Sequence, residues 1–266
     1  MFITHLDQIT SDLIEIYTTN EFQESFIGFQ FPETLQSLNL SGYTLSLIGV
    51  KFPETLQILN LHNYSQYLIG VKFPEKLQEL RLQNYTLSLI EVEFPNTLQI
   101  LNLHNYKYSL VGVIFPENLK ELMLTNYKQS LVEVKFPEKL QQLVLYVYSI
   151  SLVEVKFPKT LQKLDLNIYS FSLDGVIFPE NLKELIISNY KQSLVEVKFP
   201  EKLQKLDLYL YSMALDGVQF PHELTIIVDY LINDPKFELI KDNNIEYYYT
   251  YLKYPRDHFI KHIKNI

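Results

Sequence analysis

The chain has 266 residues, among them 20 Tyr, 17 Phe and 12 Pro but only 7 Gly, and it contains neither Cys nor Trp. With 47% hydrophobic and 20% charged residues, the composition excludes intrinsic disorder, and the absence of Cys excludes disulfides, thiolate metal sites and a cysteine nucleophile. The formal net charge of −8 disfavours nucleic acid and anionic membranes as partners, because both attract basic surfaces.

Residues 1–21 precede the first repeat, and we interpret them as an N-terminal cap. They lack a basic segment followed by an apolar run, and no part of the chain approaches the roughly 18 consecutive apolar residues of a membrane-spanning helix. Together with the absence of Cys, this favours a reducing, cytoplasmic location. A solenoid needs a cap at each end, because an open terminal strand recruits other chains.

A repeat of 21 residues occupies residues 22–223. The dipeptide Phe-Pro recurs ten times at this spacing without an insertion, from Phe31 to Phe220. When each unit is numbered from the Leu four residues after that Phe, columns 1, 4, 6, 9, 13, 16 and 18 are apolar in nearly every unit. In the first complete 21-residue repeat these columns are Leu35, Leu38, Leu40, Tyr43, Leu47, Val50 and Phe52. Such regular self-similarity predicts a solenoid of nine to ten coils.

The apolar columns contain the spacing L-x-x-L-x-L twice in each unit. In each half the last two apolar residues are two apart, which is the alternation of a strand with one face inward. A helix would need apolar residues at i, i+3, i+4 and i+7, and the repeats contain no such stretch. The pattern therefore predicts a mainly β, right-handed, leucine-rich-repeat-like solenoid, with two short parallel strands per coil and coils about 4.8 Å apart.

Column 15 holds Gly in six units, as at Gly49, and Glu in others, as at Glu91. A position that required a positive φ would disfavour Glu. We therefore expect an outward-facing position without backbone demands. Proline after Phe fits a corner where a strand stops, because Pro has no N–H to give to a ladder.

Two further columns are candidates for either structure or binding. Column 9 is Tyr in all nine complete units, from Tyr43 to Tyr211. An exposed aromatic strip would bind sugars or bases, but the column follows the inward Leu by three residues, and this favours an internal stack of rings. Column 8 is often Asn, and we expect these side chains to bond to one another and to the turn backbone. The Asn residues are Asn63, Asn84, Asn105, Asn126 and Asn189.

The unit from Tyr64 to Asn84 resembles the FNIP repeat, a relative of the leucine-rich repeats. The unit of that family has an aromatic residue, an aliphatic one four residues later and Pro ten residues after the aromatic, followed by L-x-x-L-x-F/L and Asn. All of these positions match in the unit Tyr64–Asn84, and the pattern recurs through nine complete units. Two departures stand out: Tyr followed by Thr, Ser or Lys replaces the family's Phe-Asn, and the units are one residue shorter than usual.

The resemblance implies a source among social amoebae or the large DNA viruses that infect amoebae. The bias towards Ile, Asn, Lys, Tyr and Phe, with a single Ala, fits the AT-rich genome of such a source. A viral protein would act in the host cell or the virion. Some family members place an F-box before the repeats to join ubiquitin ligases. We expect no such role here, because about 21 residues are too short for an F-box.

Leucine-rich repeats commonly bind partners through the outward positions of the first strand, which are columns 2, 3, 5 and 7 here. Five positive and five negative charges cancel on this face, which argues against phosphate recognition and favours a protein partner. Large aromatic and polar side chains on it are of the types enriched at binding hot spots. The predicted partner-binding residues are Tyr146, Tyr209, Tyr230, His62, His104 and Arg81.

An enzyme would need paired acids or an activated nucleophile. Asp165 and Asp207 stand two coils apart, roughly 10 Å on the strand spacing, near the separation of an inverting glycosidase pair. Lys163 and Lys205 precede them by two residues, and we expect these lysines to keep the pKa values of the aspartates low. The motifs G-x-S-x-G, P-loop and H-E-x-x-H do not occur. We therefore expect no catalysis, no cofactor and no metal.

Residues 224–266 lack the repeat, and we interpret them as a C-terminal cap. Asp229 interrupts the leucines of column 6 at its start. Residues 255–266 begin with Pro and carry an apolar stripe, which predicts an amphipathic helix, so that the cap is partly helical. His258 and His262 would share one face of this helix as half of a metal site, but no third ligand is placed to complete it.

The sequence as a whole predicts a non-catalytic scaffold that binds a protein partner through the outward face of the first strands. A structural or assembly component, such as a virion protein, is an alternative. A carbohydrate-active β-helix enzyme that uses stacked carboxylates is a less favoured one.

Overall fold

The computed structural model describes residues 1–19, 21–229, 246–250 and 260–262, with side chains as far as Ile227. Within it the chain forms two compact units, Met1–Leu140 and Gln141–Ile266. Both are built from the 21-residue coil, and nearly all of their regular structure is β-strand. The predicted fold class, a mainly β solenoid of parallel strands, is confirmed. Among the described residues, no helix is long and apolar enough to cross a membrane.

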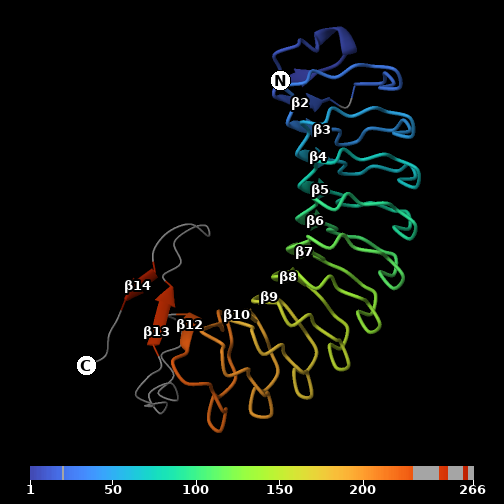
Figure 1. The fold of residues 1–266 in the computed structure, drawn as a ribbon. Helices are drawn as coiled ribbons and strands as arrows, with labels where there is room; N and C mark the ends of the chain where they lie inside the picture. The colour runs from blue at the N-terminus through green and yellow to red at the C-terminus, as the bar shows by residue number, and fades with distance from the viewer. Residues whose placement is uncertain (20, 230–245, 251–259, 263–266) are drawn as a thin grey trace. The chain divides into compact units, whose positions relative to one another are not determined.

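The first unit is a parallel ladder of seven short strands that pair in chain order, and a 3₁₀ turn, η1, lies between the first two (Figure 1). Equal columns pair from coil to coil, as Leu38 does with Leu59. The elements are β1 Phe2–Ile3, η1 Leu6–Gln8, β2 Glu15–Thr18, β3 Ser37–Asn39, β4 Ile58–Asn60, β5 Glu79–Arg81, β6 Ile100–Asn102 and β7 Glu121–Met123.

The second unit is built from the same kind of coil. Its strands are β8 Gln142–Val144, β9 Lys163–Asp165, β10 Glu184–Ile186, β11 Lys205–Asp207, β12 Thr225–Asp229, β13 Glu246–Thr250 and β14 Ile260–His262. Strands β8 to β13 pair in parallel, and β14 runs antiparallel to β13. The predicted boundaries at residues 21 and 223 separate caps from repeats, and these boundaries stay a prediction.

Each coil has one strand rather than the two that were predicted. Only the first L-x-x-L-x-L half joins the ladder. The second half closes on itself by turns, because Val50 N–H donates to Leu47 C=O at 3.1 Å and Leu56 N–H donates to Pro53 C=O at 3.0 Å. The apolar alternation in this half does mark inward side chains, but its backbone-to-backbone hydrogen bonds run within the coil.

The expectation that column 15 makes no backbone demand is wrong. Gly49 has a φ of +85° at the third position of the turn closed by Val50, as in a type II β-turn. Glu takes the same conformation in other coils, at Glu91 (φ 67°), Glu133 (69°) and Glu154 (71°). A left-handed backbone costs an L-residue roughly 1–2 kcal/mol. The coils in which Glu replaces Gly therefore carry this backbone strain.

Column 8 forms the corner directly after each strand, also with a positive φ. Asn suits this backbone, and its side chains form the predicted ladder: Asn84 Nδ2 donates to Asn63 Oδ1, and Asn105 Nδ2 to Asn84 Oδ1, both at 2.7 Å. In the second unit less suitable residues hold the same left-handed conformation. They are Val147 (φ 58°), Ile168 (60°) and Leu210 (59°).

The inward columns form the core. The Leu residues of columns 1, 4, 6 and 13 are buried in every described coil, and Tyr of column 9 is buried with them. The ring of Tyr106 lies 6.5 Å from the rings of Tyr85 and Tyr127, with planes within about 6° of parallel. The prediction of an internal tyrosine stack is confirmed.

The final described coil is one residue shorter than predicted. Lys205 pairs with Thr225 and Leu206 pairs with Ile226, so that 20 rather than 21 residues separate the paired positions. This shift places Val228, not Asp229, at the register position of column 6. The helix predicted for 255–266 is wrong at Ile260–His262, which form β14. The other residues of that segment, including His258, lie outside the described residues.

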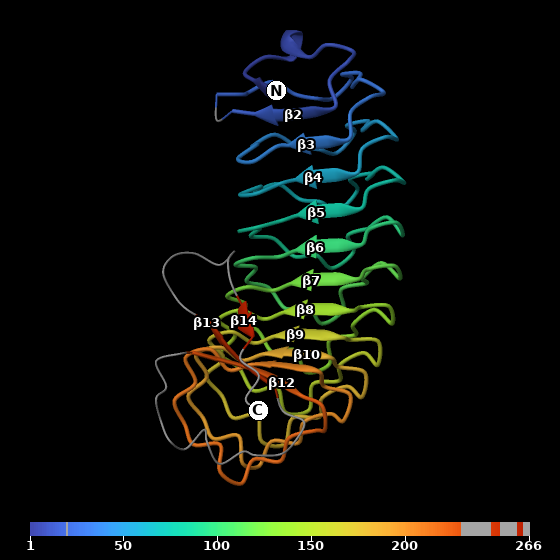
Figure 2. The ribbon, with the colours of Figure 1, turned by 90° about the vertical axis from the view of Figure 1, so that its left-hand side faces the viewer.

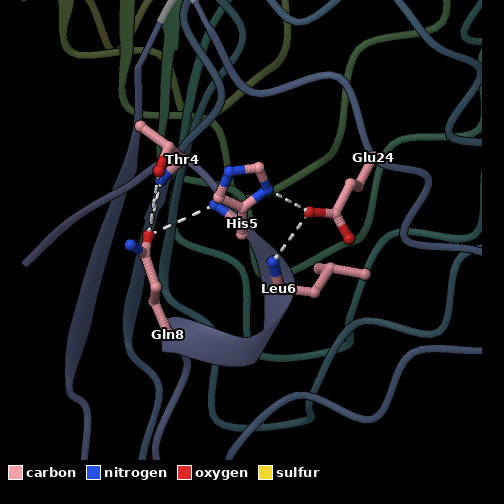
Figure 3. A network of polar contacts seen from close by, with 5 residues as sticks. All are labelled: Thr4, His5, Leu6, Gln8 and Glu24. Carbon is pink, nitrogen blue, oxygen red and sulfur yellow. Dashed lines mark hydrogen bonds and ion pairs between the residues drawn. The ribbon is translucent and has the colours of Figure 1, made fainter.

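Polar contacts fasten the N-terminal segment to the first coil (Figure 3). Gln8 Oε1 accepts hydrogen bonds from the backbone N–H groups of Thr4, at 2.7 Å, and His5, at 3.2 Å. Glu24 Oε1 lies 2.9 Å from His5 Nδ1 and accepts a hydrogen bond from Leu6 N–H at 3.3 Å. Residues 4–8 are thereby held in place over the end of the first ladder.

Candidate partner-binding face

We define the strand face as columns 2, 3, 5 and 7 of the coils that contain β3–β7 and β8–β11. The middle residue of each strand is buried, and the residues on either side of it are half-buried. Figure 2 shows the strands of the first unit lying side by side, facing the viewer. Every coil therefore presents its own outward side chains at the strand spacing on a backbone held by the ladder.

A short polar side chain in column 5 fixes the end of many strands. Its Oδ1 accepts a hydrogen bond from the backbone N–H two residues later: the N–H of His62 donates to Asn60 at 3.0 Å, and the N–H of Tyr209 donates to Asp207 at 2.9 Å. The same bond forms at Asn39, Asn102 and Asp165. These turns hold the backbone of column 7, where most of the predicted binding residues lie.

The first unit holds His62, His104 and Arg81 on its strand face, and all three are half-buried. Arg81 Nε lies 2.6 Å from Glu79 Oε1, so its charge is balanced within the face. His62 Nε2 lies 2.9 Å from Asn84 Nδ2. The two histidines share column 7, with Gln83 in the coil between them. The structure therefore brings the three predicted residues onto one face.

The second unit holds Tyr146 and Tyr209, also in column 7 and half-buried. The coils between them place Asn167 and Ser188 in that column, so the two rings are not neighbours. Tyr230, the third predicted tyrosine, lies outside the described residues.

An ion-pair ladder runs along column 3 of the second unit. Lys205 Nζ lies 2.8 Å and Lys163 Nζ 3.4 Å from the carboxylate of Glu184. Burial alone would raise the pKa of this carboxyl, but the hydrogen bonds and positive charges of the two lysines outweigh it and lower the pKa. The sequence pattern associated these lysines with Asp165 and Asp207 and gave no signal for their contact with Glu184.

The suggested acid pair has a structural use. Asp165 and Asp207 each accept a backbone N–H as turn residues, and Ser188 Oγ donates a further hydrogen bond to Asp207 at 2.8 Å. Ile186 occupies the same column between them. In the part of the chain that the structure describes, no three His, Asp or Glu residues gather as metal ligands.

The fold and this face are those of a leucine-rich-repeat solenoid. The profile of the BspA-type leucine-rich-repeat region matches the chain over residues 42–149, 75–194 and 125–238, and the profile comprises six copies of the repeat. These segments together span most of the sequence. The chain therefore belongs to the BspA-type leucine-rich-repeat family.

Several solved structures are similar to the chain. CroV588, described as a novel circular leucine-rich-repeat protein, superposes with a TM-score of 0.65 at 18% identity, over 92% of this chain and 41% of that one. This likeness shows the fold. YopM from Yersinia enterocolitica gives a TM-score of 0.39 at 15% identity, over 82% and 55% of the two chains. InlJ from Listeria monocytogenes gives 0.41 at 12% identity, over 87% and 56%.

This chain spans less than half the length of the CroV588 structure and little more than half the length of the other two. No curated protein matches the chain by sequence.

Proposed function

We propose that this chain is a non-catalytic interaction protein that binds another protein along the strand face. Leucine-rich-repeat proteins generally mediate protein–protein interactions. The observation that carries the proposal is the contrast between columns. The inward columns hardly change from coil to coil. On the strand face, column 2 is Gln in most coils, whereas the half-buried columns 3, 5 and 7 vary much more. Column 7, for example, runs Ser41, His62, Gln83, His104, Thr125, Tyr146, Asn167, Ser188 and Tyr209.

The chemistry of the face suits a protein surface. Its charges are balanced and partly paired within the face, as in the Arg81–Glu79 contact. The face therefore offers no continuous positively charged surface to an anionic polymer. Tyr146 and Tyr209 offer rigid rings with a polar end, which is the combination enriched at hot spots. Because the ladder already fixes the backbone, binding would order only side chains, and this lowers its entropic cost.

Affinity capture with the full chain tests the proposal. We expect one specific protein to be recovered, and the double variant Tyr146→Ala/Tyr209→Ala to lose it. The matched control is Phe171→Ala, which removes an aromatic ring that is 45% exposed in the same unit but lies in column 11, off the strand face. Equal loss in both variants, or full capture by the double variant with its fold intact, would contradict the choice of face.

Two narrower proposals accompany this one. We propose that the repeats are of the FNIP type, which the match of residues 64–84 to that pattern supports, and that the source is an amoebal or amoeba-virus genome. We also propose a cytoplasmic location, which the complete absence of Cys supports. Fluorescent tagging of the chain in amoebal cells would test the location.

A further inference from the structure

Column 14 of the first unit forms an exposed aliphatic row that the strand face does not include. It lies halfway through the 21 residues between consecutive strands, and Figure 1 shows that each coil extends from its strand to a looped tip and back. We call this row the apolar ridge. Its members and their exposed fractions are Ile27 (58%), Ile48 (48%), Ile69 (39%), Ile90 (43%) and Val111 (38%).

Mostly small residues border the ridge, and the two larger ones are Tyr67 in column 12, which is 61% exposed, and Glu91 in column 15. Column 12 beside it holds Ser in most coils, and the Ser hydroxyl is turned back to its own backbone, as Ser46 Oγ is to the N–H of Ile48 at 3.1 Å. Column 15 on the other side is mostly Gly. Ile90 lies close to the next coil, with its Cδ1 3.9 Å from where a Cβ of Gly112 would stand. Ile27, Ile48 and Val111 therefore have small residues on both sides.

The second unit does not preserve such a row. Its column 14 has Val153 and Val195, exposed at 39% and 40%, but Asp174 and Asp216 occupy the same column in other coils. A charge in every second coil would have to be desolvated on burial, and this disfavours an apolar contact there. The uninterrupted ridge is therefore a property of the first unit.

We propose that the apolar ridge is a self-association surface, on which a second copy of this chain packs antiparallel about a two-fold axis between Ile69 and Ile90. This goes beyond the proposed function, because the strand face stays free. A row of aliphatic groups repeating once per coil fits best against a row with the same repeat, and another copy supplies one. A two-fold axis at this point places Ile69 of each copy against Ile90 of the other.

The flanking charges favour the antiparallel arrangement. Lys72 and Glu93 lie in column 17 of the two coils next to the axis, and their side chains are about three-quarters exposed. The two-fold axis brings Lys72 of one copy opposite Glu93 of the other, twice. A parallel two-fold arrangement would instead place the column 17 rows of the two copies on opposite sides of the ridge, so that these charges would not meet. Within one chain the two groups already form an exposed ion pair at 2.6 Å, so both can be shared across the interface.

The size of the ridge sets the expected strength. Five partly exposed aliphatic side chains offer on the order of 400 Å² of apolar surface per copy, within the range of patches that serve as interaction sites. Burying such a patch on two copies gives roughly 1,000 Å² with its borders, at the low end of specific interfaces. We therefore expect a weak dimer that dissociates on dilution.

Sedimentation equilibrium of the full chain over a wide concentration range tests the proposal. We expect the average mass to rise towards that of a dimer as the concentration increases. Ile69→Asp should raise the dissociation constant of the dimer at least about tenfold. Ile14→Asp is the control, because Ile14 is 53% exposed in the same unit but lies directly before β2, away from columns 14 and 17. A wild-type chain that stays monomeric at high concentration, or equal effects of both variants, would overturn the proposal.

A charge exchange tests the two-fold geometry separately. Lys72→Glu presents acids at both flanking positions and Glu93→Lys presents bases at both, so each variant alone should dimerise less than the wild type. An equimolar mixture should recover association as a mixed dimer, because every facing pair is then opposite in sign. The like charges within each chain are unchanged by mixing, so any recovery comes from contacts between copies. Failure of the mixture to associate better than the separate variants would overturn the antiparallel arrangement.

Discussion

The hydroxyl of Tyr106 accepts a hydrogen bond from the buried N–H of Leu89, one coil earlier in the chain, at 3.0 Å. The same bond joins Tyr64 to Leu47, Tyr127 to Leu110, Tyr169 to Leu152 and Tyr190 to Leu173. Column 9 therefore serves two purposes: the ring fills the core, and the phenol oxygen satisfies a backbone donor that the turn at column 13 leaves unpaired. Phe could meet only the first of these demands.

Replacement of Tyr106 by Phe tests the second purpose. The ring and its stack are kept, but the N–H of Leu89 becomes a buried donor without a partner, which costs about 1–3 kcal/mol. We expect the free energy of unfolding, measured by urea denaturation, to fall by this amount. Tyr108→Phe is the control, because this side chain is 46% exposed, and its change should stay within about 0.5 kcal/mol. Equal changes in the two variants would be inconsistent with the buried bond.

The buried tyrosines make stability depend on pH in the alkaline range. Burial raises the pKa of the Tyr106 phenol to about 12, although the hydrogen bond from Leu89 opposes the shift, and burial likewise raises the pKa of Tyr169 to about 12. In an unfolded chain Tyr ionises near pH 10. Between these values the folded state binds more protons, so its stability is complete below about pH 10 and decreases as the pH rises towards 12.

Parallel titrations by tyrosinate absorbance and far-ultraviolet circular dichroism check this dependence. We expect the late-ionising tyrosines to titrate together with the loss of β structure. Complete ionisation of all tyrosines with an intact circular dichroism spectrum would show that the column is accessible to solvent.

The strained glutamates of column 15 offer a stabilising substitution. Glu91 has a φ of 67°, and its side chain is exposed, so Glu91→Gly removes a left-handed L-residue without removing a buried contact. Relief of roughly 1–2 kcal/mol, less the entropy that Gly adds to the unfolded chain, should leave a gain of about 0.5–1 kcal/mol. Glu117→Gly makes the same change in charge at an exposed position without a positive φ, and it should not stabilise. Thermal and urea denaturation of both variants measure the free energies of unfolding. A Glu91→Gly variant no more stable than Glu117→Gly would contradict the prediction.

The register of the coil predicts opposite outcomes for two residues that are two apart. Leu122 is buried at the centre of β7, and Leu122→Ala should cost about 2–5 kcal/mol by leaving a cavity. Lys120 is exposed on the strand face and donates a hydrogen bond to Gln99 at 2.9 Å, and Lys120→Ala should cost less than about 0.5 kcal/mol. Similar losses in urea denaturation would show that the columns are wrongly assigned.

Much of this fold could be predicted from the sequence, because ten copies of one unit average out local ambiguity. The inward columns, the stack around Tyr106 and the bonds between Asn63 and Asn84 were all expected. The second strand was wrong because apolar alternation reports which side chains point inward, and a series of turns can satisfy it as well as a ladder does. The Val50 to Leu47 hydrogen bond has no signature in the hydrophobic pattern.

Two other predictions were wrong for a different reason. They assumed that the residue type reveals the backbone conformation at its position, and that every coil has the same length. Glu91 was interpreted as evidence against a positive φ, yet a cost of roughly 1–2 kcal/mol is tolerable within a long cooperative ladder. The shortened coil before Ile226 was missed because column counting assumes a constant period. Contacts between coils, such as that of Glu184 with Lys163 and Lys205, depend on which long side chains reach one another, and column composition alone does not fix this.

Lysine labelling of the free chain and of its complex with the captured partner tests most directly whether the strand face is the binding surface. Lys120 and Lys183 are exposed on this face, one in each unit, whereas Lys51 and Lys135 are exposed in column 17, away from it. Acetylation read by mass spectrometry should slow at Lys120 and Lys183 in the complex and stay unchanged at Lys51 and Lys135. Protection of the column 17 lysines, with the strand-face lysines as reactive as in the free chain, would contradict the proposed function.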